Sequence, residues 1–270
     1  MKYVFDNDMH LHSKVSLCSN DPEQTNERIL TYAKENGLSV LCLTDHFWDE
    51  TIDGASDWYK AQNYAHISAA KPLPQCEGIK FLFGCEADMD KNLRLGIAKD
   101  TFDKFDFVVV STTHLHMTGF TVSEEDDTPE RKADLWVKRF DALLNMDLPF
   151  EKIGIAHLTC YLIAKGSREN LIKTLNMLKT EELERLFSKA AKLGCGIELN
   201  LFDINFDDVD DDAWSILRIY QIAKKCGCKF YCGSDAHHPY EFDNAKAFFD
   251  RAIDLLELTE DDKFHLMVNG

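Results

Sequence analysis

The chain has 270 residues, of which 45% are hydrophobic, and carries 30 lysines and arginines against 47 aspartates and glutamates, a formal net charge of −17 at pH 7. This length suits a single α/β domain over residues 1–270, and the negative charge disfavours long nucleic acid as a partner because like charges repel. No run approaches the ~20 apolar residues of a membrane span, so no membrane association is expected.

Nine cysteines are scattered along the chain, several of them inside apolar runs, and the N-terminus lacks the apolar core of a signal peptide. This distribution predicts a cytoplasmic protein whose thiols are mostly buried and reduced. Cys226, Cys228 and Cys232 are close in sequence, but no CxxC pair or histidine pair at finger spacing accompanies them. We therefore interpret them as buried thiols.

The first predicted strand follows the apolar run Tyr3 to Phe5 and contains Asp8-Met9-His10-Leu11-His12. Residues two apart in a strand point to the same side, so His10 and His12 present two imidazoles to one point. Two converging neutral imidazoles suit a divalent metal, whereas a hydrogen-bonded core histidine is the alternative interpretation for each. The metal interpretation gains weight if other ligand types follow other strands.

The next segments alternate between helices and buried strands that end in polar residues. Helical spacing predicts a helix from Asp21 to Asn36, and an apolar run over 38–43 predicts a strand that ends in Thr44-Asp45-His46. An amphipathic pattern predicts a helix over 57–70, and a second buried strand over 79–85 is followed by Glu86.

The middle of the chain repeats this pattern. A short strand is predicted over 93–98 and a central strand over 105–110, and a second H-x-H, His114 and His116, follows the latter. The loop 117–127 is acidic and suits a surface flap over a site. Further predicted elements are a helix over 131–144, a strand over 152–156 that ends at His157, and helices over 168–178 and 180–193 with Thr180 as N-cap.

The last third completes the alternation. A strand over 196–199 carries Glu198 and Asn200 on one face, and the acidic run 207–212 lacks calcium-loop spacing and is interpreted as a cap for a helix over 213–225. The final predicted elements are a strand over 229–232, followed by Asp235 and His237, and helices over 241–256 and 259–267. Parallel strands of an α/β barrel meet at one rim, where gathered carboxylates and imidazoles would repel or stay unsatisfied without cations.

Taken together, these motifs resemble those of the polymerase-and-histidinol-phosphatase (PHP) family of metal-dependent phosphoesterases, essentially from end to end. The matching segments are DMHLH at 8–12, LTDH at 43–46, GCE at 84–86, FDFVV before His114, IAH ending at His157, and GSDAH at 233–237. The resemblance implies an α/β fold, a distorted TIM-like (β/α)7 barrel of parallel strands with outer helices. It also implies two or three divalent metal ions, Zn, Mn or Fe.

The resemblance assigns metal-ligand roles position by position. A first metal is expected on His10, His12, Glu86 and Asp235; a second on Glu86, His114 and His157, with Glu86 bridging; and a third on His46 and His237. The family's remaining ligand of the third metal is usually a histidine a few residues beyond the first H-x-H, which this sequence lacks. Cys18, Asn20, Asp21 or water would have to serve, and a thiolate at Cys18 would favour zinc or ferrous iron.

The implied reaction is hydrolysis of a small phosphomonoester of the histidinol-phosphate type, as in histidine biosynthesis, by attack of a metal-bridging hydroxide on phosphorus. Glu86, Asp235 and His237 are the expected catalytic residues. Candidates for other roles are Lys14, Arg94 and Arg168 for binding the phosphate, Trp48 and the loop 117–127 for shaping the organic part of the substrate, and His116 and His238 for proton transfer or ligand support.

Two other interpretations stay open on the sequence. An amidohydrolase-like metal hydrolase also begins with H-x-H, but normally has eight strands and takes its bridging ligand after the fourth. A non-catalytic PHP module within a larger complex is the second alternative, although such modules often have eroded ligands. The specific ester, the native metal and the oligomeric state are not determined by the sequence.

Overall fold

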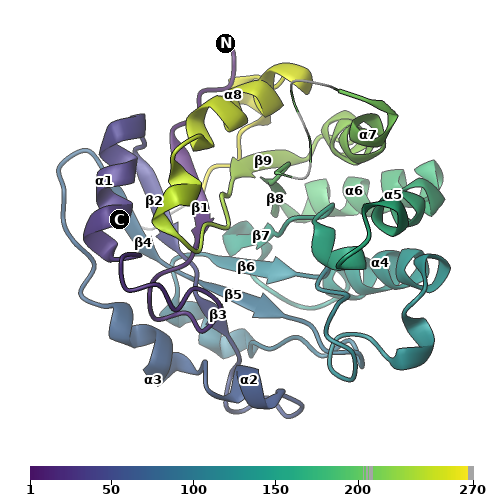
Figure 1. Ribbon diagram of the computed structural model, residues 1–270, viewed down its shortest axis with the longest axis horizontal. Coiled ribbons are helices and arrows are strands. Elements are labelled where there is room, and N and C mark those ends of the chain that lie inside the picture. The colour runs from purple at the N-terminus through teal and green to yellow at the C-terminus, as the bar shows by residue number, and fades with distance from the viewer. Residues whose placement is uncertain (203, 205, 207–208, 267–270) are drawn as a thin grey trace.

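The structure is a computed structural model that describes residues 1–202, 204, 206 and 209–266. Parallel strands occupy its centre and helices surround them (Figure 1). The strands are β1 (Asn7–Leu11), β2 (Val40–Leu43), β3 (His46–Phe47), β4 (Lys80–Phe83), β5 (Cys85–Asp88), β6 (Val108–Ser111), β7 (Ile153–Ile155), β8 (Gly196–Leu199) and β9 (Lys229–Cys232).

Most of the α-helices lie on the outside of the strands in Figure 1. They are α1 (Asn26–Asn36), α2 (Asp57–Lys60), α3 (Tyr64–Ile67), α4 (Pro129–Leu144), α5 (Arg168–Met177), α6 (Thr180–Leu193), α7 (Asp211–Lys225) and α8 (Ala245–Leu255). Short 3-10 helices are η1 (Ser68–Ala70), η2 (Lys99–Lys104), η3 (Glu124–Asp126), η4 (Phe150–Lys152), η5 (Tyr161–Ala164), η6 (Pro239–Phe242) and η7 (Glu260–Asp262).

The strands form two parallel sheets, in the orders β1-β2-β4 and β3-β5-β6-β7-β8-β9. The sheets are continuous along the chain, because β2 leads into β3 and β4 leads into β5 past Gly84. The Gly84 N–H donates to the carbonyl of Leu43 at 2.7 Å, and the Glu86 N–H donates to that of Asp45 at 3.0 Å. A Cβ at position 84 would overlap with the carbonyl oxygen of Phe107, so this bend requires glycine.

The last strand meets the first at a seam without a regular ladder. Beyond the strand ends, the Asp235 N–H donates to the His10 carbonyl at 2.7 Å and the His12 N–H donates to the Ala236 carbonyl at 3.0 Å. The predicted α/β fold with parallel strands and outer helices is confirmed. Within the described residues the ladders do not close into one continuous barrel, which is the distortion that the family resemblance implies.

Helix ends follow the capping chemistry of the sequence. Thr25 accepts a hydrogen bond from the Arg28 N–H at the start of α1, and Gly37 ends that helix with a left-handed φ of 69°. Asp210 accepts from the Ala213 N–H at 2.8 Å, so part of the acidic run 207–212 caps α7 as predicted. Asp207 and Asp208 lie outside the described residues.

Three predicted elements differ in the structure. The segment 57–70 is not one helix, because Asn63 caps a new start by accepting from the His66 N–H at 3.0 Å, which separates α2 from α3. Residues 93–98 turn instead of extending, since the Asp90 carboxylate accepts from the Arg94 N–H at 2.8 Å. The helix predicted over 259–267 is reduced in the described residues to the short 3-10 helix η7. Met267 lies outside the described residues.

Three helix starts were also placed wrongly. Helix α8 begins at Ala245 instead of at 241, because Pro239–Phe242 form the separate 3-10 helix η6. Helix α1 begins at Asn26, later than Asp21, because Thr25 supplies the cap. The N-cap of α6 is Lys179, and Thr180 is already helical.

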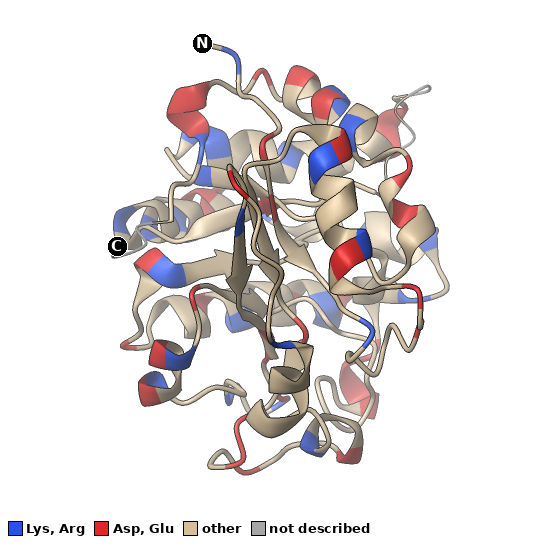
Figure 2. Cartoon of the chain, turned by 90° about the vertical axis from the view of Figure 1, so that its left-hand side faces the viewer, with Lys and Arg blue, Asp and Glu red and all other residues tan. Residues whose placement is uncertain are grey.

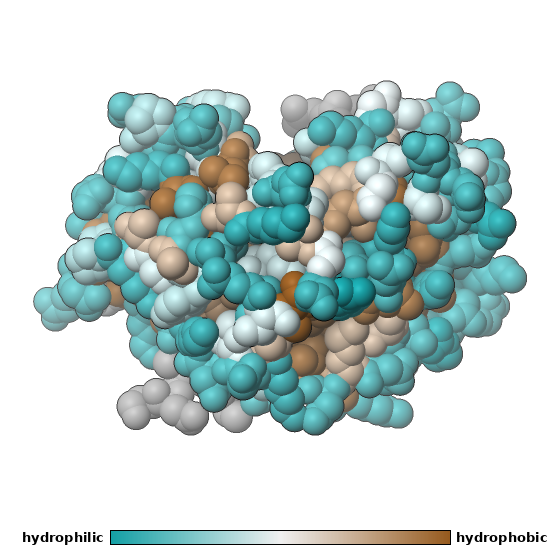
Figure 3. Space-filling view, turned by 90° about the horizontal axis from the view of Figure 1, so that it is seen from below, coloured by the Kyte–Doolittle hydropathy of each residue, from teal (hydrophilic) through white to brown (hydrophobic). Residues whose placement is uncertain are grey.

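The molecular surface is predominantly polar. Basic and acidic residues interleave on the outer helices (Figure 2), and hydrophobic side chains reach the surface in small groups on the face shown in Figure 3. Among the described residues, no helix has the length and apolar character needed to span a bilayer.

Candidate metal centre

The carboxyl ends of the strands bring all eight predicted metal ligands together. They form three overlapping groups whose ligand atoms lie within 4.8 Å of one another: His10, His12, Glu86 and Asp235; Glu86, His114 and His157; and His12, Cys18, His46 and His237. Because the side chains come from six different strands or the loops that follow them, the parallel order of the strands is what gathers them. Their binding of metal stays a prediction.

Glu86 on β5 is the centre of the arrangement. Its Oε2 lies 3.0 Å from His46 Nδ1 and 3.4 Å from His10 Nε2, and its Oε1 lies 3.1 Å from His157 Nε2. Burial alone would raise the pKa of this carboxyl, but the imidazoles of His46 and His10 outweigh burial and hold the pKa well below its usual range. Glu86 is therefore an ionised carboxylate whose two oxygens face different groups.

Asp235 and the two histidines of β1 complete the first group. The Asp235 Oδ1 lies 3.0 Å from His12 Nε2 and 3.3 Å from His10 Nε2. Burial would raise the pKa of Asp235, but the charge of His10 and the hydrogen bond from His12 lower it far below its usual value. Its backbone is left-handed, with a φ of 54°, and His157 also has a positive φ, 20°, which is uncommon outside glycine and occurs at functional sites.

Two buried ligand atoms in these groups lack hydrogen-bond partners among the described residues, His10 Nε2 and Glu86 Oε2. An unsatisfied polar atom in the interior costs roughly 1–3 kcal/mol, so such atoms call for a partner. Both face the same small space, and neutral imidazole nitrogens and carboxylate oxygens are the donors that Zn, Mn and Fe accept. The residues present therefore fit divalent metal ions.

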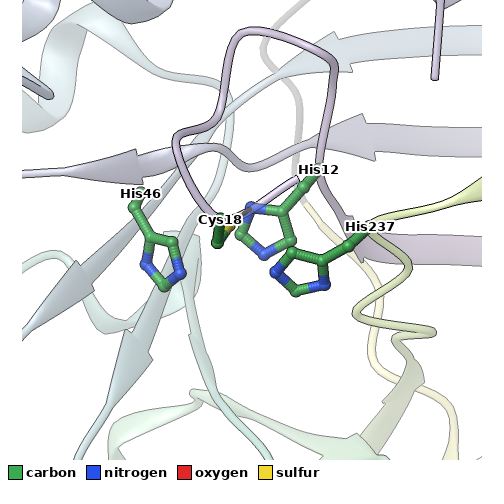
Figure 4. A group of neighbouring side chains, drawn as sticks. All are labelled: His12, Cys18, His46 and His237. Atoms are coloured by element: carbon green, nitrogen blue, oxygen red, sulfur yellow. Dashed lines mark hydrogen bonds between the residues drawn. The ribbon is translucent and has the colours of Figure 1, made fainter. Parts of the chain in front are cut away.

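The third group contains the sequence's one departure from the family pattern. His12, Cys18, His46 and His237 point toward one another in Figure 4, and the Cys18 Sγ lies 3.9 Å from His12 Nδ1. Burial would raise the pKa of this thiol, but His12 and His46 lower it to about 2. Of the three residues that the sequence left open, Cys18 joins this group and lines the cavity, whereas Asn20 is exposed and does not line it. Asp21 instead accepts from His238 Nδ1 at 2.9 Å.

Glu198 on β8 supports the first group, and the sequence analysis assigned it no role. It is fully buried, and its Oε1 lies 2.7 Å from His10 Nδ1, which donates to it. Its second oxygen accepts from the His157 backbone N–H. A carboxylate that holds the second nitrogen of a ligating histidine fixes its tautomer and orientation. The sequence contained one signal that could have indicated this role, the polar face that Glu198 and Asn200 share at the end of the strand.

Asp88 on β5 has a similar position behind His114. Its Oδ2 lies 2.6 Å from His114 Nδ1 and accepts from the Tyr59 hydroxyl at 2.8 Å. The fully buried Arg139 of α4 lies 3.6 Å from the other oxygen and donates to the backbone carbonyls of Thr112, Met89, Asp90 and Thr121. Asp88 could have been found from its i+2 spacing to Glu86, but Arg139 has no sequence signal.

A cavity of about 830 Å³ opens over the three groups. Its wall includes four aromatic side chains that stay partly exposed, by 36% to 66%: Trp58, Tyr161, Phe202 and Tyr240. Lys165 is the one lysine or arginine among the described residues that line it. The cavity therefore combines a polar floor of ligand groups with a flat, partly apolar wall.

The predicted phosphate-binding residues do not line this cavity. Arg94 donates to the carbonyl of Asp53 at 2.6 Å, Arg168 pairs with Asp212 at 3.3 Å, and Lys14 is exposed elsewhere. Trp48 is buried and donates to the Ile52 carbonyl, so it does not shape the cavity either. The geometry gives no support to the roles predicted for these four residues.

The candidates for proton transfer do line the cavity. Burial and the neighbouring His114 lower the pKa of His116 to about 4, so its imidazole is neutral at pH 7, and its Nδ1 has no hydrogen-bond partner in the described chain. His238 pairs with Asp21 and stacks on Tyr240, with ring centroids 5.2 Å apart. Met117 is the residue of the predicted flap 117–127 that lines the cavity.

Comparisons with known proteins add three findings. A family model described as PHP domain matches residues 8–202. A search of curated protein sequences gives no significant match. Among solved structures, this chain is similar to a histidinol phosphate phosphatase from Lactococcus lactis crystallised with zinc, L-histidinol and phosphate, with a TM-score of 0.58, 19% identity, and coverage of 93% of this chain and 94% of that one.

A second similar structure is a protein from Listeria monocytogenes assigned as a histidinol phosphatase. Its TM-score is 0.60 and its identity 14%, with coverage of 90% of this chain and 99% of that one. At these identities the two likenesses support the fold, and the chemistry has to be argued from the site itself.

Proposed function

This chain belongs to the PHP domain family, and from that membership we propose that it is a metal-dependent phosphoesterase acting on a small phosphomonoester. The observation that carries the proposal is the position of Glu86. One carboxylate faces two groups of nitrogen and oxygen donors, through Oε2 toward His10 and through Oε1 toward His157. That arrangement suits two ions held close together by a shared ligand.

The residues would divide the work as follows. His10, His12 and Asp235 would hold one ion, His114 and His157 the other, and Glu86 would be shared by both. Two divalent ions held by these residues would supply an activated water and would neutralise the charge of a phosphate monoester. Glu198 and Asp88 would keep His10 and His114 in the tautomer that offers Nε2 to the centre.

We assign phosphate recognition to Lys165 in place of Lys14, Arg94 and Arg168. Lys165 lines the cavity together with His116, and its ammonium is a strong donor to phosphoryl oxygens. The loss of a charge-assisted hydrogen bond of this kind costs about 1.5–3 kcal/mol. Lys165→Met is therefore expected to lower kcat/KM by about one to two powers of ten without loss of metal.

The wall of the cavity indicates the organic part of the substrate. Trp58, Tyr161, Phe202 and Tyr240 offer partly exposed aromatic rings, which favour a flat or aromatic group over a short alkyl chain. The similar Lactococcus lactis structure holds L-histidinol, whose imidazole is such a group. Histidinol phosphate is therefore the first ester to test.

The amidohydrolase-like alternative has no observation in its favour. The shared carboxylate lies on β5, which continues β4. If β2 with β3 and β4 with β5 are each counted as one interrupted strand, Glu86 belongs to the third strand of the chain and not to the fourth. A non-catalytic module is also disfavoured, because such modules often have eroded ligands, whereas the eight candidate residues here lie in three close groups.

The test is phosphate release from metal-replete protein, with histidinol phosphate, 2-phenylethyl phosphate and ethyl phosphate as substrates. We expect turnover of the first two, and a loss greater than about 100-fold in Glu86→Gln and Asp235→Asn together with loss of bound metal. Glu181→Gln, on an exposed position of α6, is the matched control and should keep wild-type rates.

The wall is tested by a second pair of variants. Phe202→Ala should raise KM for the aromatic ester. Trp214→Ala is the control: it removes an exposed aromatic residue that does not line the cavity, and it should leave this KM unchanged. Absence of phosphate release from every ester by fully loaded protein would reject the proposed function.

A further inference from the structure

We propose that Cys18 is a thiolate ligand to a metal ion held together with His46 and His237, and that this sulfur makes the position select zinc over manganese. The inference rests on the proposed metal centre, but it concerns a different ion from the two that Glu86 shares. At this position Cys18 takes the place of the histidine that is usual in the family, so a thiolate sulfur replaces an imidazole nitrogen.

The three side chains reach the same point from separate elements. Cys18 lies on the loop after β1, His46 begins β3, and His237 follows β9 (Figure 4). Their ligand atoms belong to one group within 4.8 Å, and all three residues line the cavity. One sulfur and two nitrogens would supply three of the four ligands that zinc usually takes in proteins.

His12 is a neighbour of this ion, and we do not count it as a ligand. Its Nε2 lies 3.0 Å from Asp235 Oδ1 and so faces the first group. A neutral imidazole offers one lone pair, so with Nε2 committed there its Nδ1 carries the hydrogen. That nitrogen lies 3.3 Å from Ser16 Oγ and 3.9 Å from Cys18 Sγ. Ser16 and the thiolate would together fix the tautomer of His12, which would couple the two metal positions through one ring.

The loop after β1 is built to hold the sulfur in place. Ser16 Oγ lies 3.0 Å from Cys18 Sγ and can donate to it, and the Ser19 hydroxyl donates to the carbonyl of His237 at 2.6 Å. The second bond ties this loop to the one that carries His237. Cys18 and His237 are thereby positioned relative to each other by a side-chain hydrogen bond between their two loops.

The sulfur sets this position apart from the other two. Their donors are imidazole nitrogens and carboxylate oxygens, which zinc, manganese and iron all accept. Thiolate is a soft ligand that favours zinc and disfavours manganese. A chain grown or incubated with excess manganese should therefore keep one zinc ion at Cys18 while the other positions exchange.

Cobalt substitution tests the sulfur ligand directly. Metal is removed from the full-length protein with a chelator, Co²⁺ is added, and the near-ultraviolet thiolate-to-cobalt charge-transfer band is recorded. We expect the band in the wild-type protein and its loss in Cys18→Ser. Cys18→His should keep the cobalt content without the band, which guards against a misfolded serine variant. Cys160→Ser is the matched control, because Cys160 is the other described cysteine that lines the cavity.

Competition tests the selectivity. Protein is equilibrated with zinc and excess manganese, and bound metal is counted by mass spectrometry. The preference for zinc at one position per chain should fall by about tenfold or more in Cys18→His, with no change in Cys160→Ser. A wild-type protein loaded with cobalt that lacks the band, or a band that survives in Cys18→Ser, overturns the inference.

The two proposals fail in different ways. A chain that shows the band but hydrolyses no phosphate ester rejects the proposed function and leaves the Cys18 ligand standing. A chain that hydrolyses phosphate esters but never shows the band rejects the Cys18 ligand alone.

Discussion

Glu198→Gln is the sharpest test of how the metal centre is supported. The side chain is fully buried and makes two contacts, one with His10 Nδ1 at 2.7 Å and one with the His157 backbone N–H. Glutamine has nearly the same shape but only one accepting oxygen. One of the two donors must therefore face an NH₂ group in the variant.

The size of the effect follows from these two contacts. A hydrogen bond to a charged group contributes about 1.5–3 kcal/mol, and a buried donor without an acceptor costs about 1–3 kcal/mol. Loss of a carboxylate behind a ligating histidine lowers metal affinity by about 10–100-fold, which corresponds to about 1.4–2.7 kcal/mol. We expect metal affinity to fall by this amount at the position that includes His10, and to fall less at the position that includes His157.

The assay is competition with a coloured chelator, followed by counting of the metal that stays bound. Glu181→Gln on the surface of α6 serves as the control for a change of one charge. If Glu198→Gln binds metal as tightly as the wild type at every position, then Glu198 does not orient His10 and the reasoning is refuted.

Three further outcomes are expected. Gly233→Ala should reproduce the metal loss of the Glu198 variant, because a Cβ at position 233 would overlap with Glu198 Oε1 and lie 2.8 Å from His10 Cβ. A wild-type metal content in Gly233→Ala would show that this close packing is not needed for metal binding. Arg139→Met should lower the free energy of unfolding in urea by about 3–5 kcal/mol, because it leaves Asp88 and four backbone carbonyls without their buried partner. The control Lys138→Met, at the exposed neighbouring position, should change this free energy little. Chelation of metal should lower Tm and abolish phosphate release, with both restored by zinc, because Glu86 and Asp235 then lack the cation that offsets their repulsion; an unchanged Tm would argue against bound metal.

The sequence predicted the positions of the ligand groups because strand ends leave a local signature. Most of the apolar runs are followed within a few residues by an imidazole or carboxylate, as at His46, Glu86 and His157. Helix ends with a capping residue were also predictable, as Gly37 and Asp210 show. Asn63 illustrates the limit, because one side-chain cap divided a segment whose apolar spacing predicts a continuous helix.

Side-chain direction beyond the strand ends was not predictable. Lys14, Arg94 and Arg168 were chosen for their place near rim loops, but nearness in sequence does not tell which way a long side chain extends. Lys165 was missed for the same reason, since it follows a loop whose path over the cavity is set by contacts with other elements.

By itself the sequence determined the alternation of strands and helices, the family pattern and the identity of eight candidate ligands, because these depend on periodicity and on neighbours along the chain. The tertiary structure alone decided that Cys18 joins the histidines and lines the cavity while Asn20 and Asp21 do not line it, and that Glu198 holds His10 from another strand. Those choices depend on contacts between residues 188 and 218 positions apart, and such contacts exist only once the strands have assembled around one centre.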